Sequence, residues 1–312
     1  ASRSARARAS HTLRLVSTRP DRGPLERAVT PLSVRILAFV NPAAKGAGAA
    51  IRELKKRDFD VRVSLPGQLD DAVREALARG ATRVLVAGGD GSIRAAASVL
   101  RGTQCELAIL PAGTLNHLAR DLGIPQEIDD AVRVAAESTR VESIDVADVN
   151  QRTFLNTSSV GAYVTFVRTR ERLERRFGYR IASIVAAFRI LNRLRSFRVR
   201  LEVEGEERSY LTPLVFVALG KRELRLPSLG ARVPHGGRRL HVMVLRAQSG
   251  ARAVALALVA AVRGERAVPN GVGMDSFVVD RLHIEPQGRR RRLSLALDGE
   301  IVDVASPLEY RV

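Results

Sequence analysis

The sequence is poor in the side chains that several common kinds of functional site require. Its 312 residues include one cysteine, Cys105, no tryptophan and only 4% aromatic residues. A single thiol excludes an intrachain disulfide, and one cysteine with five histidines offers none of the usual zinc-ligand spacings. Stacking platforms for single-stranded nucleic acid are hard to build with so few rings. We expect Cys105 to be a small buried packing residue in a reducing compartment.

Long apolar runs are also missing. The strongest candidate, AVALALVAAV at residues 253–262, has about half of the roughly 20 residues that a membrane-spanning helix needs, and arginines flank it. Residues 1–32 are rich in arginine, serine and alanine and lack the apolar centre of a secretory signal. We predict a disordered basic tail over residues 1–32, with a targeting or lipid-surface role left open, and a cytoplasmic protein.

Positive charge is what the chain has in abundance, and most of it is arginine. There are 51 Lys+Arg against 33 Asp+Glu, so the formal net charge is +18. Such an excess attracts polyanions, including nucleotides, nucleic acid and anionic lipid head groups. An ordinary solvated surface in an arginine-rich protein accounts for the same surplus. Charge alone therefore leaves a nucleic-acid binder open, although the shortage of aromatic residues counts against it.

The order of the segments predicts two domains. Hydrophobic residues make up 46% of the chain, which is enough for a sizeable core. Apolar strand-like runs alternate with amphipathic helical segments over residues 33–139, which predicts a three-layer, Rossmann-like α/β domain with a parallel sheet. Strand patterns dominate residues 140–312, including a hairpin that turns at Asn150-Gln151. They predict a β-rich, antiparallel, sandwich-like second domain, whose last segment could pack on the first.

A glycine-rich loop at residues 88–92, with the sequence GGDGS, joins a predicted strand to a predicted helix. Its glycines would let backbone N–H groups turn toward a phosphate, and the N-terminus of the following helix favours negative charge. Asp90 would hold Mg²⁺ against the phosphates or position the loop. A plain turn between strand and helix is the alternative.

Another loop, NPAAKG at residues 41–46, also follows a predicted strand. Ligands of parallel sheets bind at the carboxyl ends of the strands, so its position matches that of the GGDGS loop. Asn41 can hydrogen-bond its own turn or a neighbouring phosphate loop, Pro42 sets the entry of the chain, and Lys45 adds a cation. A purely structural loop is the alternative.

The third loop of this kind lies within LPAGTLNHLARDLGIP, at residues 110–125. Gly113 and Thr114 follow a predicted strand and precede a helix, so they offer another pair of hydrogen-bond donors. Asn116 would either reach a nucleotide or brace the loop. His117 is a candidate base, with a position on the helix surface as the more ordinary explanation.

Together the three loops resemble one family. Asn-Pro, Gly-Gly-Asp-Gly-Ser and Pro-x-Gly-Thr-x-Asn, in this order and at these strand ends, resemble the diacylglycerol kinase catalytic domain. That lipid kinase family includes soluble bacterial diacylglycerol kinases and sphingosine kinases, and its nucleotide domain is related to that of NAD kinases. The resemblance runs from residue 34 to residue 312. The family has a β-rich lipid-binding domain in its second half, with an Asp-Gly-Glu motif near the end, here at residues 298–300.

The resemblance implies an ATP-dependent lipid kinase that uses Mg²⁺ and phosphorylates the hydroxyl of diacylglycerol or a similar lipid alcohol. Glu300 would accept the hydroxyl proton with Asp298 beside it, and Asp90 would act through ATP-bound Mg²⁺. The residues that we expect to bind the nucleotide, from the resemblance and from the chemistry of the loops, are Asn41, Pro42, Lys45, Gly46, Ser64, Gly88, Gly89, Asp90, Gly91, Ser92, Arg94, Gly113, Thr114 and Asn116.

Several positions depart from the family pattern. Arg94 and Ala95 stand where many members have Asn and Glu, and Lys45 stands where the first loop often has Gly. Residues 233–242 lack the carboxylates with which many bacterial members bind a structural Mg²⁺, so we expect no such metal there. These departures leave a catalytically weakened nucleotide- or lipid-binding protein as one alternative. A NAD-kinase-like enzyme is another, disfavoured because its Asn-Glu pair and Thr-Ala-Tyr stretch are absent.

The lipid side of the resemblance points to residues 166–200, where arginines mix with Phe, Ile, Leu and Val at helical spacing. That pattern suits a basic amphipathic surface at an anionic membrane. An ordinary core stripe with solvated arginines is the alternative, and the basic run at 288–293 permits the same two interpretations. We expect peripheral contact with the inner face of the membrane and no specific nucleic-acid partner. A homodimer is compatible with the pattern.

Overall fold

The structure is a computed structural model of the chain. It describes residues 11–17, 26–27, 36–65, 67–191, 196–203, 205–220, 222–224, 229–232, 239–246, 274–287 and 291–312. Contacts divide the chain into two compact units, Ala1–Val146 and Ala147–Val312, a few residues beyond the expected boundary at 139/140. The apolar run at 253–262 lies outside the described residues, as do residues 288–290 of the basic run.

The first unit contains a seven-stranded sheet in the order β2-β7-β1-β6-β5-β3-β4. The strands are β1 (Thr12–Val16), β2 (Glu26–Arg27), β3 (Leu37–Val40), β4 (Asp60–Val63), β5 (Arg83–Gly88), β6 (Glu106–Pro111) and β7 (Arg140–Asp145). The five strands β1, β6, β5, β3 and β4 are neighbours in this order and pair in parallel. Strand β7 is antiparallel to both of its neighbours, β1 and β2. Every residue of β5 and β6 is buried, as expected for central strands covered on both faces.

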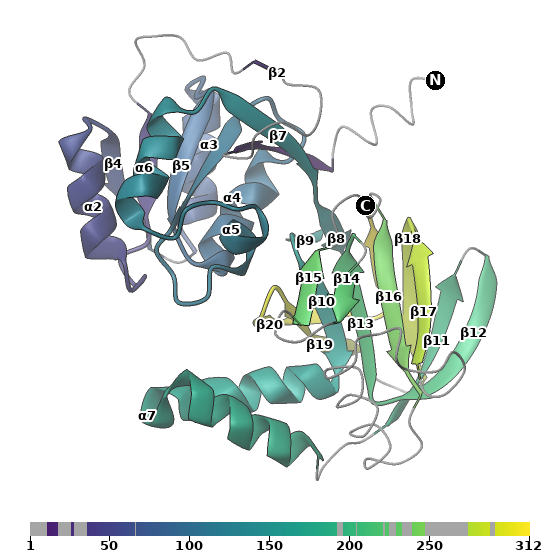
Figure 1. Cartoon of the computed structure of the whole chain (residues 1–312). Coiled ribbons are helices and arrows are strands. Elements are labelled where there is room, and N and C mark those ends of the chain that lie inside the picture. The colour runs from purple at the N-terminus through teal and green to yellow at the C-terminus, as the bar shows by residue number, and fades with distance from the viewer. Residues whose placement is uncertain are drawn as a thin grey trace, which may run out of the picture. The chain divides into compact units, whose positions relative to one another are not determined.

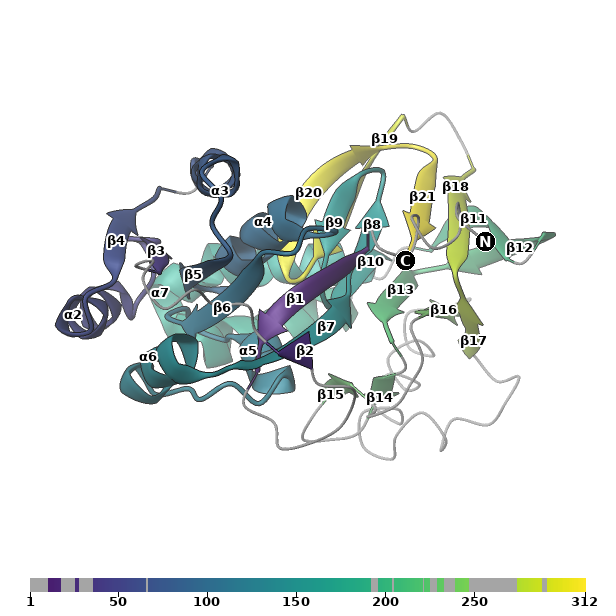
Figure 2. The ribbon, with the colours of Figure 1, turned by 90° about the horizontal axis from the view of Figure 1, so that it is seen from above.

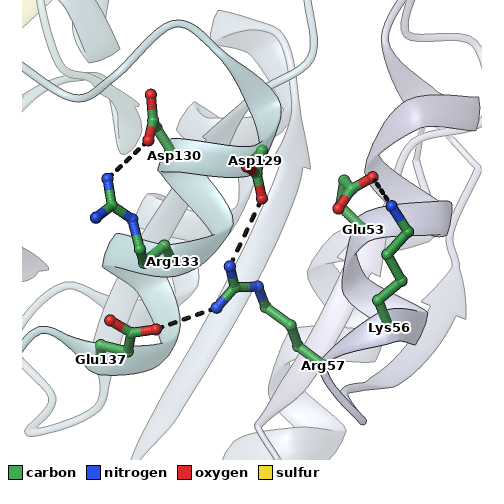
Figure 3. A network of polar contacts seen from close by, with 7 residues as sticks. All are labelled: Glu53, Lys56, Arg57, Asp129, Asp130, Arg133 and Glu137. Carbon is green, nitrogen blue, oxygen red and sulfur yellow. Dashed lines mark hydrogen bonds and ion pairs between the residues drawn. The ribbon is translucent and has the colours of Figure 1, made fainter.

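Helices cover both faces of this sheet (Figure 1, Figure 2). They are α2 (Ala47–Lys56), α3 (Leu69–Ala78), α4 (Asp90–Leu100), α5 (His117–Asp121) and α6 (Ile128–Glu137). Contacts pair α2 with α6 and α3 with α4. At the end of α2, the Arg57 guanidinium lies 3.1 Å from Glu137 and 3.6 Å from Asp129 on α6 (Figure 3). The predicted three-layer α/β architecture is confirmed.

The predicted disordered tail is wrong for residues 12–16, which form β1 inside the sheet. This strand pairs in parallel with β6 and antiparallel with β7. Leu13 and Leu15 are buried in the core, at 0% and 2% exposure. Their alternation with Thr12 and Arg14 is a strand pattern that the surrounding arginines obscured. Because the pattern is only five residues long, its stability depends on the two neighbouring strands.

A buried charged cluster lies at the start of β5 and β6. The Arg83 guanidinium is 2.7 Å from the Glu106 carboxylate, and Arg14 of β1 is 3.7 Å from the same carboxylate. Cys105 precedes Glu106 and is buried, as predicted. Its burial, reinforced by the Glu106 charge, raises the pKa of Cys105 to about 12. The thiol is therefore protonated at neutral pH and acts as a packing group.

The second unit consists mainly of antiparallel strands. They are β8 (Ala147–Val149), β9 (Arg152–Phe154), β10 (Thr157–Gly161), β11 (Phe197–Val203), β12 (Glu206–Thr212), β13 (Leu214–Leu219), β14 (Arg222–Leu224), β15 (Leu229–Arg232), β16 (Leu240–Leu245), β17 (Met274–Val279), β18 (Arg281–Pro286), β19 (Arg292–Leu297), β20 (Glu300–Ala305) and β21 (Leu308–Arg311). One described helix, α7 (Ala162–Leu191), follows β10.

Two six-stranded sheets of this unit share one hydrophobic core. Their orders are β17-β16-β13-β10-β19-β20 and β12-β11-β18-β21-β8-β9. Buried side chains from both sheets, such as Val217 and Leu308, belong to the same cluster. The predicted hairpin turn at Asn150-Gln151 joins β8 to β9. The last strand, β21, pairs with β18 and β8. The last segment, which we expected could pack on the first domain, is therefore part of the second unit.

Candidate functional site

Three loops follow three adjacent parallel strands of the first unit. Strand β3 ends at Val40, β5 at Gly88 and β6 at Pro111. These strands are neighbours in the order β6-β5-β3. Because parallel strands end at one edge of a sheet, the three loops predicted to form the site share that edge. The sheet thus brings together loops that follow residues 40, 88 and 111 of the chain.

Hydrogen bonds fasten the first loop to the other two. The Asn41 backbone N–H donates to the Ala87 carbonyl at 2.9 Å, and its side-chain amide donates to the Ser92 hydroxyl at 3.0 Å. The Gly46 N–H donates to the Ala112 carbonyl at 2.9 Å. Asn41 also accepts a hydrogen bond from the Ala43 N–H, so it fulfils both roles expected from the sequence. The loops therefore form one connected edge.

One glycine allows the third loop to touch the second, and another allows the second loop to fold on itself. A Cβ atom added to Gly113 would lie 2.4 Å from the Cα atom of Gly89, and one added to Gly88 would lie 2.5 Å from the Ser92 Cβ. Real Cβ atoms do not approach other atoms so closely, so the two loops meet only because Gly113 has no side chain, and the Ser92 side chain fits only because Gly88 has none. The glycine pattern that suggested phosphate binding thus also has a packing cause.

Helix α4 begins at Asp90 with its N-terminus at this edge. Its N-cap residue, Gly89, makes no side-chain capping bond. The first-turn N–H groups of an α-helix have no partner within the helix, and together with the helix dipole they favour a bound anion. Gly91 and Ser92 lie in this first turn and are partly exposed. The sequence GGDGS therefore produces a helix N-terminus of the kind that binds phosphate.

The other predicted nucleotide-binding residues lie around the same edge. Pro42, Lys45 and Thr114 are exposed in the first and third loops. Ser64 is buried directly after β4, and its N–H donates to the Val40 carbonyl at 3.0 Å. Arg94 is partly buried on α4. Because β4 is next to β3 in the sheet, Ser64 also lies at the end of the sheet that carries the loops.

Both carboxylate oxygens of Asp90 accept backbone hydrogen bonds from α5. The His117 N–H donates to one oxygen and the Leu118 N–H to the other, each at 3.1 Å. Asp90 thereby caps a helix from outside the helix's own sequence. It ties the second loop to the third, which is the positioning role that the sequence had left open.

Asn116 braces the third loop. Its side-chain oxygen accepts the Gly113 N–H, and its amide donates to the Gly113 carbonyl, both at 3.0 Å. Asn116 has a left-handed backbone, with φ 50°, and is buried. Of the two roles expected for Asn116, bracing the loop is the one that the structure displays. His117 is exposed at the start of α5, in agreement with its more ordinary explanation.

The Asp-Gly-Glu motif forms a tight hairpin in the second unit. Leu297 of β19 pairs with Glu300 of β20, and the two residues between them have positive φ, 48° at Asp298 and 88° at Gly299. A two-residue turn of this kind strongly favours glycine at its second position. Glu300 is exposed as the first residue of β20.

Asp298 is held by three consecutive backbone N–H groups. Its carboxylate accepts hydrogen bonds from Leu155 and Asn156 at 2.8 Å and from Thr157 at 2.9 Å. Its own N–H donates back to the Thr157 carbonyl at 2.8 Å. The Asp298 carboxylate therefore fastens the turn to residues 155–157. Glu300 follows this turn.

Sequence reasoning did not identify two sets of partners in these loops. They are the N–H groups of residues 155–157, which hold Asp298, and those of residues 117–118, which hold Asp90. A backbone N–H belongs to almost every residue type, so no residue letter marks it. Only the conformation of the chain makes these groups converge on a carboxylate.

The first unit is a doubly wound α/β domain with glycine loops at one sheet edge, and the second is an antiparallel β sandwich. Comparison with known proteins shows what the chain is similar to. Residues 35–149 match the family model described as the diacylglycerol kinase catalytic domain. A "Diacylglycerol kinase" of Mycobacterium tuberculosis is 32% identical over 186 residues, which cover 55% of this chain and 60% of that protein. The family resemblance inferred from the motifs is confirmed.

Two further comparisons agree with this family. A "Probable lipid kinase YegS-like" of Klebsiella pneumoniae is 36% identical over 125 residues, covering 38% of this chain and 42% of that protein. A crystal structure of a diacylglycerol kinase from Bacillus anthracis aligns with a TM-score of 0.60 at 20% identity, covering 89% of this chain and 93% of that one. The structural match shows the common fold, and the aligned segments span about half the length of the curated relatives.

The described residues contain neither a membrane-spanning helix nor a cluster of metal ligands. No helix in the described part of the chain is long and apolar enough to cross a membrane. No group of three or more His, Cys, Asp and Glu side chains in the described ranges is placed to hold a metal ion. Of residues 233–242, where a structural metal was considered, 233–238 lie outside the described part.

Proposed function

We propose that this protein is an ATP-dependent lipid kinase that transfers the γ-phosphate of ATP to the hydroxyl of diacylglycerol or a similar lipid alcohol. The observation that carries the proposal is the connected edge of three loops, with the uncapped N-terminus of α4 beside two glycine contacts that leave no room for side chains. This arrangement fits a phosphate chain better than a hydrophobic ligand.

The nucleotide would be held mainly by backbone groups. The N–H groups of Gly91 and Ser92, in the first turn of α4, would meet the phosphates, with Thr114 and Lys45 exposed nearby. ATP-bound Mg²⁺ would neutralise phosphate charge, and an oxygen of Asp90 would be its protein contact. Mg²⁺ commonly binds through one or two carboxylates together with phosphates, so the lack of a carboxylate cage in the described residues suits this mode.

Glu300 would accept the proton of the lipid hydroxyl. Phosphoryl transfer needs positioning, charge neutralisation and a base that orients the attacking hydroxyl. Glu300 is exposed on a turn that Asp298 locks through three backbone hydrogen bonds, so its backbone is held in one place. Asp298 then acts as a positioning residue for Glu300. We further propose that the protein works in the cytoplasm at the inner face of the membrane, where its positive charge meets anionic lipid.

Transfer of labelled phosphate tests this function. Purified protein, Mg²⁺ and labelled ATP are offered diacylglycerol, other lipid alcohols and NAD, and the labelled product is identified. We expect a labelled lipid, and a Glu300→Gln variant that binds ATP normally but transfers roughly 10²- to 10⁴-fold more slowly. Glu309→Gln, at an exposed glutamate of the same unit, is the matched control.

Other outcomes of this assay would contradict the proposal in distinct ways. ATP binding without transfer to any acceptor would identify the catalytically weakened binding protein. Labelled NAD would identify the NAD-kinase-like alternative. Undiminished transfer by Glu300→Gln would remove Glu300 from the role of base while leaving the kinase activity in place.

A further inference from the structure

Helix α7 exposes a group of large apolar side chains around a sharp bend. Gly178 has non-helical dihedral angles, φ 73° and ψ 165°, and Figure 1 shows the helix doubling back on itself. Phe177, directly before the bend, is 47% exposed, while Ile181 and Val185 after it are 54% and 40% exposed. Ile181 and Val185 are four residues apart, so they lie on one face of the returning arm. We call these three residues the α7 apolar group.

Several described positions of α7 are buried. Ala182 and Ala186 on the returning arm are fully buried, at 0% exposure. On the first arm, Val164 and Val167 pack with Ala296 of β19 in a second hydrophobic cluster. The buried positions show that α7 already has an inward face. The α7 apolar group is therefore an additional surface that the second unit leaves uncovered.

The first arm is also anchored close to the proposed base. The Arg168 guanidinium donates to the Ser294 hydroxyl of β19 at 2.7 Å, and that hydroxyl donates to Asp303 of β20 at 2.6 Å. Ile301, the residue after Glu300, packs against the cluster that contains Val164 and Val167. Helix α7 and the Asp-Gly-Glu turn are thus carried by the same pair of strands, β19 and β20.

The charge on α7 indicates what kind of partner would cover the apolar group. The helix contains seven arginines and two glutamates. Both glutamates, Glu171 and Glu174, face Arg170 at 3.7 Å and 3.6 Å. Arg172, Arg176 and Arg189 are exposed, and the Arg176 guanidinium lies 5.4 Å from the centre of the Phe177 ring. Exposed arginines beside apolar side chains match a surface that is anionic outside and apolar beneath.

We propose that the α7 apolar group and its flanking arginines dock this protein on an anionic lipid bilayer. The side chains of Phe177, Ile181 and Val185 enter the boundary between head groups and acyl chains, while Arg172 and Arg176 contact the acidic head groups. A second copy of the chain fits this surface less well, because it presents the same arginines and a net charge of +18 of the same sign.

The biological role of this docking surface rests on the proposed lipid kinase function. A kinase whose acceptor hydroxyl belongs to a membrane lipid must bring its base to the bilayer. Because β19 and β20 carry both α7 and Glu300, docking through α7 holds the proposed base at a fixed height relative to the membrane surface. The surface makes its own prediction about binding, which is independent of catalysis.

Vesicle flotation of the full chain tests the proposal. The vesicles contain phosphatidylcholine alone or with about one third phosphatidylglycerol, at low and high salt. We expect binding only to the anionic vesicles, and a loss of roughly tenfold or more in partitioning for the variant Phe177→Ser, Ile181→Ser, Val185→Ser. The matched control is Leu211→Ser with Val278→Ser, two apolar side chains of the same unit that are 45% and 40% exposed.

Each outcome has a defined meaning. Equal vesicle binding by the parent and the triple variant, or an equal loss in the control, would overturn the proposal. A parent that is dimeric in solution and a triple variant that is monomeric with unchanged vesicle binding would assign the surface to self-association instead. The single variant Ile181→Ser, with a smaller loss of binding, serves if the triple variant does not fold.

A separate measurement keeps docking and catalysis apart. Phosphate transfer to a short-chain lipid alcohol dissolved as monomers needs no membrane. We expect the triple variant to retain this activity and to lose activity only on vesicle-bound substrate. A parent that binds anionic vesicles but transfers phosphate to no lipid would contradict the proposed function and leave the docking surface standing.

Discussion

At the scale of single residues, one aspartate in each unit binds backbone amides. Asp90 accepts N–H groups from His117 and Leu118, and Asp298 accepts those of residues 155–157. Hydrogen bonds to an ionised acceptor are about twice as strong as neutral ones, so each aspartate fixes the geometry of a loop. In the proposed function, the group that binds phosphate would be the α4 N-terminus, and the group that accepts the proton would be Glu300.

Replacement of Asp298 by asparagine tests this positioning role in the second unit. The amide has one acceptor oxygen, and its NH₂ group would face the Leu155 N–H, which now donates to the second carboxylate oxygen. We expect Asp298→Asn to lower the free energy of unfolding by roughly 2–3 kcal/mol, measured by urea unfolding.

The control for Asp298→Asn is a surface aspartate of the same unit. Asp280 forms an ion pair with Arg239 at 2.9 Å, and its side chain is 71% exposed. Such a pair contributes at most about 1 kcal/mol, so Asp280→Asn should change stability little. Similar losses in both variants would show that the three backbone hydrogen bonds of Asp298 have no special weight.

Replacement of Asp90 distinguishes a capping role from a metal-binding role. Asp90→Asn removes one of the two acceptors for the α5 N–H groups and loosens the third loop. Loss of such a cap costs up to about 2 kcal/mol, so the Kd of ATP should rise by up to roughly thirtyfold. If capping dominates, calorimetry will show the same rise with and without Mg²⁺.

The matched control for this titration is Asp130→Asn, at an aspartate that pairs with Arg133 on the surface of α6 at 2.7 Å. It should leave ATP affinity unchanged under both conditions. A rise in Kd for Asp90→Asn that appears only in the presence of Mg²⁺ would instead identify Asp90 chiefly as a metal ligand.

At the scale of secondary-structure elements, β1 is an inner strand of the α/β sheet, formed by a segment near the start of the sequence. Strand β1 separates β6 from β7 and contributes Leu13 and Leu15 to the core. Its Arg14 lies 3.7 Å from the buried Glu106 carboxylate. A segment that looked like a basic tail therefore supplies a buried part of the sheet.

Truncation of Leu13 measures this contribution. Leu13→Ala leaves a cavity in the core against the face of β1, whose neighbours are β6 and β7, and should lower the free energy of unfolding of the first unit by about 2–5 kcal/mol. Amide hydrogen exchange should show weaker protection in those two strands. Leu65→Ala is the control, because Leu65 is 52% exposed in the same unit and its loss should cost no more than about 0.5 kcal/mol. An equally small effect at Leu13 would contradict the placement of β1.

Most other elements of the first unit could be predicted because their patterns are local and repeated. Helix α3, at Leu69–Ala78, is one of the amphipathic segments, and β5 and β6 coincide with apolar runs. Strand β1 was missed because a five-residue strand between arginine-rich flanks carries too little periodic signal. The stability of β1 comes from the pairing partners Leu107 and Ile144, which are distant in the sequence.

At the scale of the whole molecule, the dominant property is the net charge of +18. A field of this size raises the local concentration of any polyanion, including ATP, anionic lipid and nucleic acid. Affinity for a polyanion is therefore weak support for function. The specific sites should be recognised by features beyond charge, which are the glycine contacts at the loops and the apolar side chains on α7.

Binding to DNA tests whether charge alone governs that interaction. Fluorescence anisotropy with two unrelated duplexes should give the same Kd, and binding should weaken linearly in a plot of log affinity against log salt. We expect the Leu211→Ser, Val278→Ser control of the vesicle experiment to bind both duplexes as the parent does. A reproducible preference for one duplex would support the nucleic-acid alternative that the scarcity of aromatic residues disfavours.

The sequence by itself determined the fold class, the order of the two domains and the position of each glycine loop after a strand. These features depend on the periodicity of neighbouring residues and on glycine where the chain turns sharply. The tertiary structure decided that Asp90 and Asp298 hold loops, that residues 12–16 join a sheet, and that α7 leaves three apolar side chains uncovered. Asn156 and Asp298 are 142 residues apart, and contacts of this kind arise only when the folded chain brings distant backbone groups together.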